Sequence, residues 1–532
     1  MNTDKKPKQF LPKSLTCVIN LSNLSLFAYV VVQAILLLTH ESWRDEVSPW
    51  IQTQDSSWAD IVYKSQLELQ SPVFFSVLKL LHFLTDDFWA YRLFLFFLTV
   101  GTAFIIKSLC NNSWRWQVLI YSNYYIIYEY SAIQRIYTVS LFSLMIFLFY
   151  LRRDLSFGRS ISLLTKISLL LLSTISIWTL ILSILILLTL IFYKVIPVFT
   201  RFILIYLTLM FTQLLLLLSS KDRDWGVDSD NSKNLVNLDN LVLIFTAPIR
   251  SVIFIPGSTL NGWNTNILLE TSVGFGLTIF LAIIFYTILL LFVLRGNYIG
   301  ILWFLSISAL SILVGLGKQR HLGQIFLLVL TIVFLEIFIC KSKVNFFRIK
   351  SQLSTGFLRI LLLISLVVSP ISIVRDVKYE FTTARNLYTF IEEGDLLIVQ
   401  DSGKNTHLPL VLELNREVFS LFGGSYSRES LLNKISRSIP NELELSEKFR
   451  EVCLSVKPSR VLLFTDIETR RNFQQFTGKL LSRSQSAIVD NEGKRELWLL
   501  AWQASDVKKL CSNPYSSQFL SRIKTEAVSY GS

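Results

Sequence analysis

Charged side chains are scarce in this chain: Asp, Glu, Lys and Arg together supply only 17% of its 532 residues. That share, beside 52% hydrophobic residues, excludes an ordinary soluble protein. Bases outnumber acids and give a net charge of +13, but no basic stripe lies beside stacking aromatic residues. We therefore exclude nucleic acid as a partner. The bases instead cluster at the ends of apolar segments, as expected of a protein in a lipid bilayer.

Histidine is also rare, with four in the whole chain, and the spacing of the four fits no zinc-binding motif. No glycine pattern of the Walker or dinucleotide type opens a helix, so a nucleotide-binding loop is excluded. Oxygen ligands with a spacing dedicated to a divalent ion are missing too. We expect no tightly bound cofactor and no metal-ligand set, and the use of a divalent cation stays open.

Apolar blocks of about twenty residues, the length that crosses a bilayer, recur along the first two thirds of the chain. The first block, Leu21–Thr39, has no small-residue cleavage site after it. Four lysines precede it: Lys5, Lys6, Lys8 and Lys13. We therefore predict a retained helix, with residues 1–20 in the cytoplasm and residues 21–374 forming the transmembrane domain.

Loop charge sets the expected orientation of the later blocks. Residues 41–87 hold eight acids against three bases and should form an outer loop, with interfacial helices at Ser56–Gln70 and Pro72–Leu84. The fold class expected is a mainly α, polytopic bundle of about 11–13 transmembrane helices. The further expected spans are Phe88–Leu109, Trp116–Tyr130, Tyr137–Leu151, Ile161–Trp178, Ile181–Ile196, Phe202–Leu218, Leu268–Leu294, Ile301–Leu316, Phe326–Cys340 and Phe357–Val374, with an embedded helix at Asn240–Ile255.

Residues 375–532 have a soluble composition and should form a small extracytoplasmic α/β domain. Strands are expected at Leu396–Gln400, Val461–Thr465 and Glu496–Trp502, and helices at Glu444–Val456 and Thr469–Leu481. This part also carries Cys453 and Cys511. Whether these two cysteines form a disulfide stays open.

Three groups of polar residues should meet the membrane at its outer face. The first, His40–Trp50, follows the first span and holds the neighbouring acids Asp45 and Glu46. A carboxylate there can take the proton of an incoming hydroxyl or amine while that nucleophile attacks the anomeric carbon of a sugar. The alternative is a solvated loop that tryptophans anchor at the interface.

The second group, Tyr128–Tyr137, places Glu129 and Arg135 at membrane depth, where ionisable groups are costly unless they pair or line a wet cavity. A structural ion pair between these two residues is the alternative. The third group, Lys318–Gly323, has cations that could hold a lipid phosphate or simply extend to the interface. Together the groups supply a base, a second acid and cations, which suits chemistry with a phosphate leaving group.

Particular strings in these groups resemble the polytopic GT-C glycosyltransferases, the superfamily of protein mannosyltransferases and lipid A aminoarabinose transferases. The strings Trp43-Arg44-Asp45-Glu46 and Gln54-Asp55-Ser56-Ser57 resemble the acidic motif and interfacial helix of that family's first outer loop. Glu129-Tyr130, Arg135 and Tyr137 resemble its second outer turn, and Arg320-His321 with Gly323 resembles a late signature of one bacterial branch. The resemblance covers residues 20–150 and, more loosely, 300–340.

The resemblance implies that Asp45 is the catalytic base, Glu46 its partner and Glu129 the second acid. Substrate contacts would come from Arg44, Arg135 and Tyr137, and the carrier phosphate would face Lys318, Arg320 and His321. The chain departs from the family twice. Family members often have Gly-His-Pro where this chain has Gln70-Ser71-Pro72, so the role of that histidine is lost or passes to Gln70. Many also carry Gln-Glu where this chain has Ala132-Ile133, which leaves Glu129 as the acid.

The function expected is an inverting membrane glycosyltransferase in a bacterial inner membrane, the inversion being implied by the resemblance. It would move a sugar from a polyprenyl-phosphate donor to a glycan, lipid or protein acceptor on the extracytoplasmic face. Two other classes stay open. One is a transporter or lipid flippase, in which the buried acids and Arg form a substrate or proton path. The other is a scaffold whose outer domain binds partners.

Overall fold

The computed structural model describes most of the chain between residues 20 and 342, positions within 356–377, and the strands and one helix of the C-terminal part. The described residues are 20–40, 42, 44–54, 56–67, 70, 72–133, 135–157, 160–197, 200–218, 238–255, 266–294, 298–314 and 319–342, then 356, 359, 362–363, 365–366, 369–374 and 377, and finally 390–392, 394–399, 419–420, 425–426, 442–466, 479–485 and 496–503.

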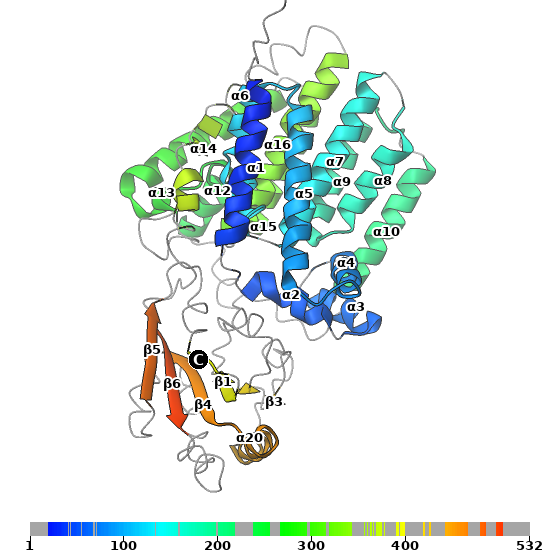
Figure 1. Ribbon diagram of the computed structural model, residues 1–532. Helices are drawn as coiled ribbons and strands as arrows, with labels where there is room; N and C mark the ends of the chain where they lie inside the picture. The colour runs from blue at the N-terminus through cyan, green and yellow to red at the C-terminus, as the bar shows by residue number, and fades with distance from the viewer. Residues whose placement is uncertain are drawn as a thin grey trace, which may run out of the picture.

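Helices packed side by side make up the larger part of the molecule (Figure 1). They are α1 (Leu21–Thr39), α5 (Phe88–Leu109), α6 (Trp114–Tyr121), α7 (Ile136–Ser156), α8 (Leu163–Ser173), α9 (Ile177–Phe192), α10 (Arg201–Leu218), α12 (Leu238–Val252), α14 (Ser272–Leu294), α15 (Tyr298–Val314) and α16 (Gln319–Ser342). In the part of the chain that the structure describes, α1, α5, α7 and most of α14 are long and apolar enough to cross a membrane. Large apolar side chains cover the outside, for example Phe27 and Phe97, which are 65% and 67% exposed. The predicted polytopic helical bundle is confirmed.

Helix α7 occupies the middle of the bundle, because it packs against α5, α8 and α16. Gly101 of α5 lets α7 come close, because a Cβ at this position would lie 2.9 Å from the ring of Phe142 on α7. Small residues at helix contacts let backbones come close where lipid provides no hydrophobic driving force. Helix α5 begins where predicted, since Asp87 accepts a hydrogen bond from the backbone N–H of Trp89 at 2.9 Å and caps its first turn.

Two predicted spans are interrupted. The block Trp116–Tyr130 is not one helix, because α6 ends at Tyr121 and a π-helical turn, η1 (Tyr125–Glu129), follows. The side chain of Asn123 accepts a hydrogen bond from the N–H of Tyr125 at 3.0 Å and starts this new turn. The block Leu268–Leu294 is likewise divided into α13 (Ile267–Glu270) and α14, and the Thr271 hydroxyl between them accepts a hydrogen bond from the N–H of Gly274.

Three short helices lie across one end of the bundle, which we call the α2 end (Figure 1). They are α2 (Arg44–Gln54), α3 (Trp58–Leu67) and α4 (Pro72–His82), and the last two correspond to the predicted interfacial helices. Hydrogen bonds from Ser57 lower the pKa of the exposed Asp60 and cap α3. The ring of His82 lies tilted against that of Trp50, with centroids 3.7 Å apart, and its Nε2 donates to the Trp50 carbonyl, which ties α4 to α2.

The C-terminal part contains a mixed sheet with strand order β3-β2-β1-β4-β6-β5 and lies beyond the α2 end in Figure 1. Its elements are β1 (Asp395–Val399), β2 (Phe419–Ser420), β3 (Ser425–Tyr426), α20 (Glu442–Val456), β4 (Arg460–Asp466), β5 (Lys479–Gln485) and β6 (Glu496–Gln503). Strand β1 runs parallel to β4, and Arg460 binds Asp395 through two hydrogen bonds that raise the pKa of the arginine.

The small α/β fold predicted for this part is confirmed, with one error. The predicted helix Thr469–Leu481 is wrong at its end, because residues 479–481 belong to β5 and pair with β6. Residues 469–478 lie outside the described residues, as does Cys511. Cys453, which is buried on α20, is disulfide-bonded.

Candidate active site

The first candidate group begins where α1 ends. His40 follows the last turn of α1, and its Nε2 lies 3.0 Å from Oε2 of Glu46 on α2, with both side chains almost fully buried. Arg92 of α5 donates hydrogen bonds to the carbonyls of Leu37 and His40 at 2.5 and 3.0 Å. A cation at a helix C-terminus satisfies carbonyls that have no partner within the helix. The alternative of a solvated loop is therefore wrong for Glu46, which has no exposed surface.

Asp45 and Arg44 occupy the first turn of α2, immediately before Glu46. The side chains of Arg44 and Asp45 lie outside the described residues, so the helix alone fixes their position. A carboxylate in the first turn of a helix is stabilised in its charged form by the backbone N–H groups of that turn. The backbone therefore places Asp45 one residue from a buried carboxylate, at the α2 end.

The second candidate group is built on the π-helical turn η1, which ends at Glu129. The Glu129 side chain is 1% exposed and accepts a hydrogen bond from the Tyr124 hydroxyl at 2.9 Å. Helix α1 binds the irregular backbone of this turn: the Tyr29 hydroxyl donates to the carbonyl of Ile126, and the Gln33 amide donates to that of Ile127. Backbone that departs from the α-helix within a bundle is tolerated where protein groups satisfy it in this way.

Aromatic residues connect the first group to the second. The ring of Tyr128 meets that of His40 edge-on, with centroids 6.5 Å apart. Tyr91 of α5 is fully buried and lies within electrostatic range of both Glu46 and Arg135. Two buried carboxylates, from segments far apart in the sequence, are thus held around one set of aromatic side chains.

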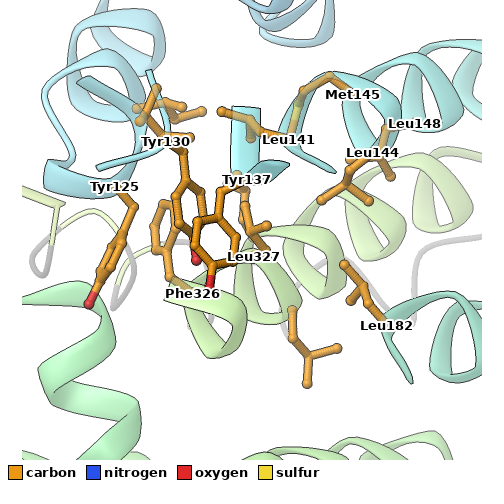
Figure 2. Packing of buried hydrophobic residues seen from close by; sticks show 14 of the residues in the cluster. Tyr125, Tyr130, Tyr137, Leu141, Leu144, Met145, Leu148, Leu182, Phe326 and Leu327 are labelled. Atoms are coloured by element: carbon orange, nitrogen blue, oxygen red, sulfur yellow. The ribbon is translucent and has the colours of Figure 1, made fainter. Parts of the chain in front are cut away.

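The third candidate group meets the second at the start of α16. Nδ1 of His321 lies 3.4 Å from the hydroxyl of Tyr137, and the guanidinium of Arg135 lies 5.6 Å from the ring of Tyr137. Tyr137 stacks on Tyr130 at 5.1 Å, and Gln324 donates a hydrogen bond to the Tyr130 hydroxyl at 3.1 Å. Figure 2 shows Tyr130 and Tyr137 side by side, next to Phe326 of α16.

Gly323 allows this contact between α16 and the tyrosines. A Cβ at position 323 would lie 2.2 Å from the Tyr130 hydroxyl and 2.5 Å from the ring of Tyr125. Both distances are far below van der Waals contact, and both tyrosines are fully buried. Gly323 is therefore required because the ring of an aromatic residue comes so close to its Cα.

Of the three remaining predicted residues, only Gln70 has a contact within the part of the chain that the structure describes. Arg320 occupies the first turn of α16 beside His321, with its side chain outside the described residues, and Lys318 lies outside them altogether. Gln70 forms an isolated antiparallel bridge with Ser176, the cap of α9. Two residues further on, Trp178 lies 5.6 Å from the ring of His321. Gln70 is thus attached to the segment that borders the third group.

His40 and Tyr124, which contact the two acids, were not predicted from the sequence, and neither was the buried Tyr91. The pairing of His40 with Glu46 had a local signal, since only five residues separate them, directly after a span. Tyr91 and Tyr124 carried no such signal, because tyrosines in apolar segments are common. Within the residues that the structure describes, no group of three or more His, Cys, Asp or Glu residues could hold a metal ion.

Comparison with solved structures finds chains of similar fold. No family model and no curated protein matches the chain. The crystal structure of ArnT from Cupriavidus metallidurans bound to undecaprenyl phosphate resembles it with a TM-score of 0.45 and 7% identity, over 90% of this chain and 97% of that one. A likeness of this degree does not indicate a function. We infer the function from the contacts of this chain instead.

Proposed function

We propose that the chain is a membrane glycosyltransferase that takes a sugar from a polyprenyl-phosphate donor at the α2 end. One observation supports this most strongly. The buried acids Glu46 and Glu129 lie near the same group of tyrosines as Arg135 and His321. Buried ionisable groups at membrane depth are costly and are kept where they serve a function. Acids beside cations match the needs of a reaction in which a nucleophile loses a proton and a phosphate departs.

In the proposed step, the carboxylate of Asp45 takes the proton of the acceptor hydroxyl or amine. The acceptor atom bonds to the anomeric carbon as the bond from that carbon to the phosphate oxygen breaks, with inversion. The electron pair leaves on the phosphate, which Lys318, Arg320 and His321 stabilise. Glu46, held by His40, and Glu129, held by Tyr124, orient the acceptor. Arg44, Gln70, Arg135 and Tyr137 contact the donor or acceptor.

The α2 end would face the extracytoplasmic side of a bacterial inner membrane, with the N-terminus in the cytoplasm and the boundaries 1–20, 21–374 and 375–532 as predicted. Two observations support this orientation. Cys453 is disulfide-bonded, and disulfides persist in oxidising compartments. Helix α20, which carries Cys453, and the sheet beside it lie beyond the α2 end (Figure 1), on the side where the donor would be used.

The test is the substitution Asp45→Asn, which removes the base and keeps the shape of the side chain. Asp60→Asn is the matched control, because Asp60 is an exposed acid on the same segment and the asparagine oxygen can still accept the hydrogen bonds from Ser57. Loss of one catalytic base costs about 10²- to 10⁴-fold in rate. We expect that loss for Asp45→Asn alone, and transfer at an undiminished rate by this variant would refute the assignment.

A transporter or lipid flippase is the second candidate, and one observation favours it. The interruptions between α6 and η1 and between α13 and α14 resemble the discontinuous helices at which transporters bind substrates. A transporter does no covalent chemistry. Sugar transfer by the purified protein in detergent, where no second compartment exists, therefore separates the two candidates.

A further inference from the structure

A cavity of about 430 Å³ opens where α5 ends, at the opposite end of the bundle from α2 (Figure 1). Its lining consists of Phe104, Lys107, Ser108, Asn111, Asn112 and Arg152. Volumes of this size are common for sites that bind small molecules. Two cations and no acid line the cavity, so its occupant should be an anion.

The turn that ends α5 has a fixed conformation. The N–H of Asn112 binds the carbonyl of Lys107, and the N–H of Asn111 binds that of Ser108. These are the two hydrogen bonds of a Schellman motif, and Asn111 and Asn112 have the left-handed φ values of 51° and 57°. Asparagine tolerates this conformation better than most residues. The floor of the cavity is therefore a preformed turn.

Both cations are held in place from neighbouring helices. Arg152 of α7 donates hydrogen bonds to the carbonyl of Ser108 and to the side chain of Asn111. The ammonium group of Lys107 donates to the side chain of Asn23 in the first turn of α1. These contacts use only some of the N–H groups that an arginine and a lysine carry. Further donors on both side chains can bind an anion.

Aromatic residues at this end indicate that the cavity lies at headgroup depth. Trp114, at the start of α6, is 41% exposed and has the guanidinium of Arg115 at 5.7 Å from its ring. The guanidinium of Arg153 lies 5.8 Å from the ring of Tyr150. Tryptophan, tyrosine and bases gather where a bilayer meets water. Phe104, 55% exposed and one helical turn before Lys107, gives the cavity an apolar side.

We propose that this cavity binds the phosphate of an anionic membrane lipid through Lys107 and Arg152, with an acyl chain against Phe104. Basic pockets between transmembrane helices are known to bind such headgroups. The site is separate from the proposed active site and does not depend on the proposed function. A free phosphate ion has the same chemistry toward the two cations, but it would not use the exposed ring of Phe104.

The experiment titrates the full-length protein in mild detergent with phosphatidylglycerol and, in parallel, with phosphatidylcholine, and counts bound lipid by native mass spectrometry. Lys107→Gln is the deciding variant, because its hydrogen bond to Asn23 can be kept by glutamine. Arg153→Gln is the matched control, since Arg153 is a neighbouring base that does not line the cavity. Because Lys107 lines the cavity and Arg153 does not, removing Lys107 should weaken binding about fivefold.

We expect phosphatidylglycerol to bind more tightly than phosphatidylcholine, and we expect Lys107→Gln but not Arg153→Gln to weaken it. A size-exclusion profile like that of the unmodified protein shows that the variant is folded, and Lys107→Arg should restore binding. Equal binding of both lipids would overturn the proposal, and so would equal losses in the two glutamine variants. Displacement of phosphatidylglycerol by millimolar inorganic phosphate would assign the cavity to a free anion instead of a lipid.

Discussion

Replacing Gly323 by alanine tests whether the contact between α16 and the buried tyrosines positions the active site. The added Cβ would lie 2.2 Å from the Tyr130 hydroxyl and 2.5 Å from the Tyr125 ring, so one of these groups has to move. Neither ring has exposed surface into which it can turn. Overpacking a filled interior costs about 1–3 kcal/mol. We expect a stability loss in that range.

Activity should fall as well, because the displaced Tyr130 stacks on Tyr137, whose hydroxyl contacts His321. A shift of about 1 Å in a catalytic arrangement can cost around 100-fold in rate. The matched control is Gly276→Ala on α14, where an added Cβ has no atom within 4 Å. Alanine is favoured over glycine within a helix by about 1 kcal/mol, so the control should be neutral or slightly stabilising.

The assay measures the thermal unfolding midpoint of each detergent-purified variant by intrinsic fluorescence, and then the rate of sugar transfer below the midpoint. We expect a lower unfolding midpoint and a lower rate of sugar transfer for Gly323→Ala and for no other variant in this comparison. If Gly323→Ala and Gly276→Ala behave alike in both measurements, the tyrosines are not held by α16, and the site does not have the arrangement described above.

Other predictions concern the residues that hold the acids and the C-terminal sheet. His40→Ala removes a hydrogen-bond partner from buried Glu46 and should destabilise the protein by about 1–3 kcal/mol, seen as a lower unfolding midpoint, whereas an unchanged midpoint would show that the pair contributes nothing. Cys453→Ser should destabilise the C-terminal part by about 2–5 kcal/mol, measured as faster limited proteolysis after residue 375. In the unmodified protein, unfolded so that maleimide reaches the buried Cys453, this cysteine should react only after reduction, and reaction without reductant would contradict the disulfide.

Local signals in the sequence were enough to predict much of the bundle. Helix α5 has the predicted bounds because the capping residue Asp87 and the apolar run after it act within the segment itself. The interfacial helix α4 was found for the same reason, since Pro72 stands at its first position. These elements need no distant partner to define where they begin.

The interruption at η1 could not be predicted in this way. Its residues are aromatic and aliphatic like those of α6, and the groups that bind its carbonyls, Tyr29 and Gln33, come from α1, about a hundred residues earlier. Strand β5 was missed for a similar reason, because its pairing with β6 decides its structure and propensity does not. The contact between His321 and Tyr137 also depends on packing between helices that are far apart in the sequence. The sequence could predict only that both residues lie at the same face of the membrane.

Sugar transfer in detergent is the most direct measurement of the central claim, that the carboxylates at the α2 end carry out glycosyl transfer. The purified protein would be given polyprenyl-phosphate sugars and acceptors, and the free polyprenyl phosphate and the glycosylated product would be followed by mass spectrometry. We expect both products in equal amounts from the unmodified protein, with a rate of formation about 10²- to 10⁴-fold lower in Asp45→Asn and also reduced in Glu129→Gln. Movement of the lipid-linked sugar across vesicles by this protein, with no product formed from any donor, would contradict it.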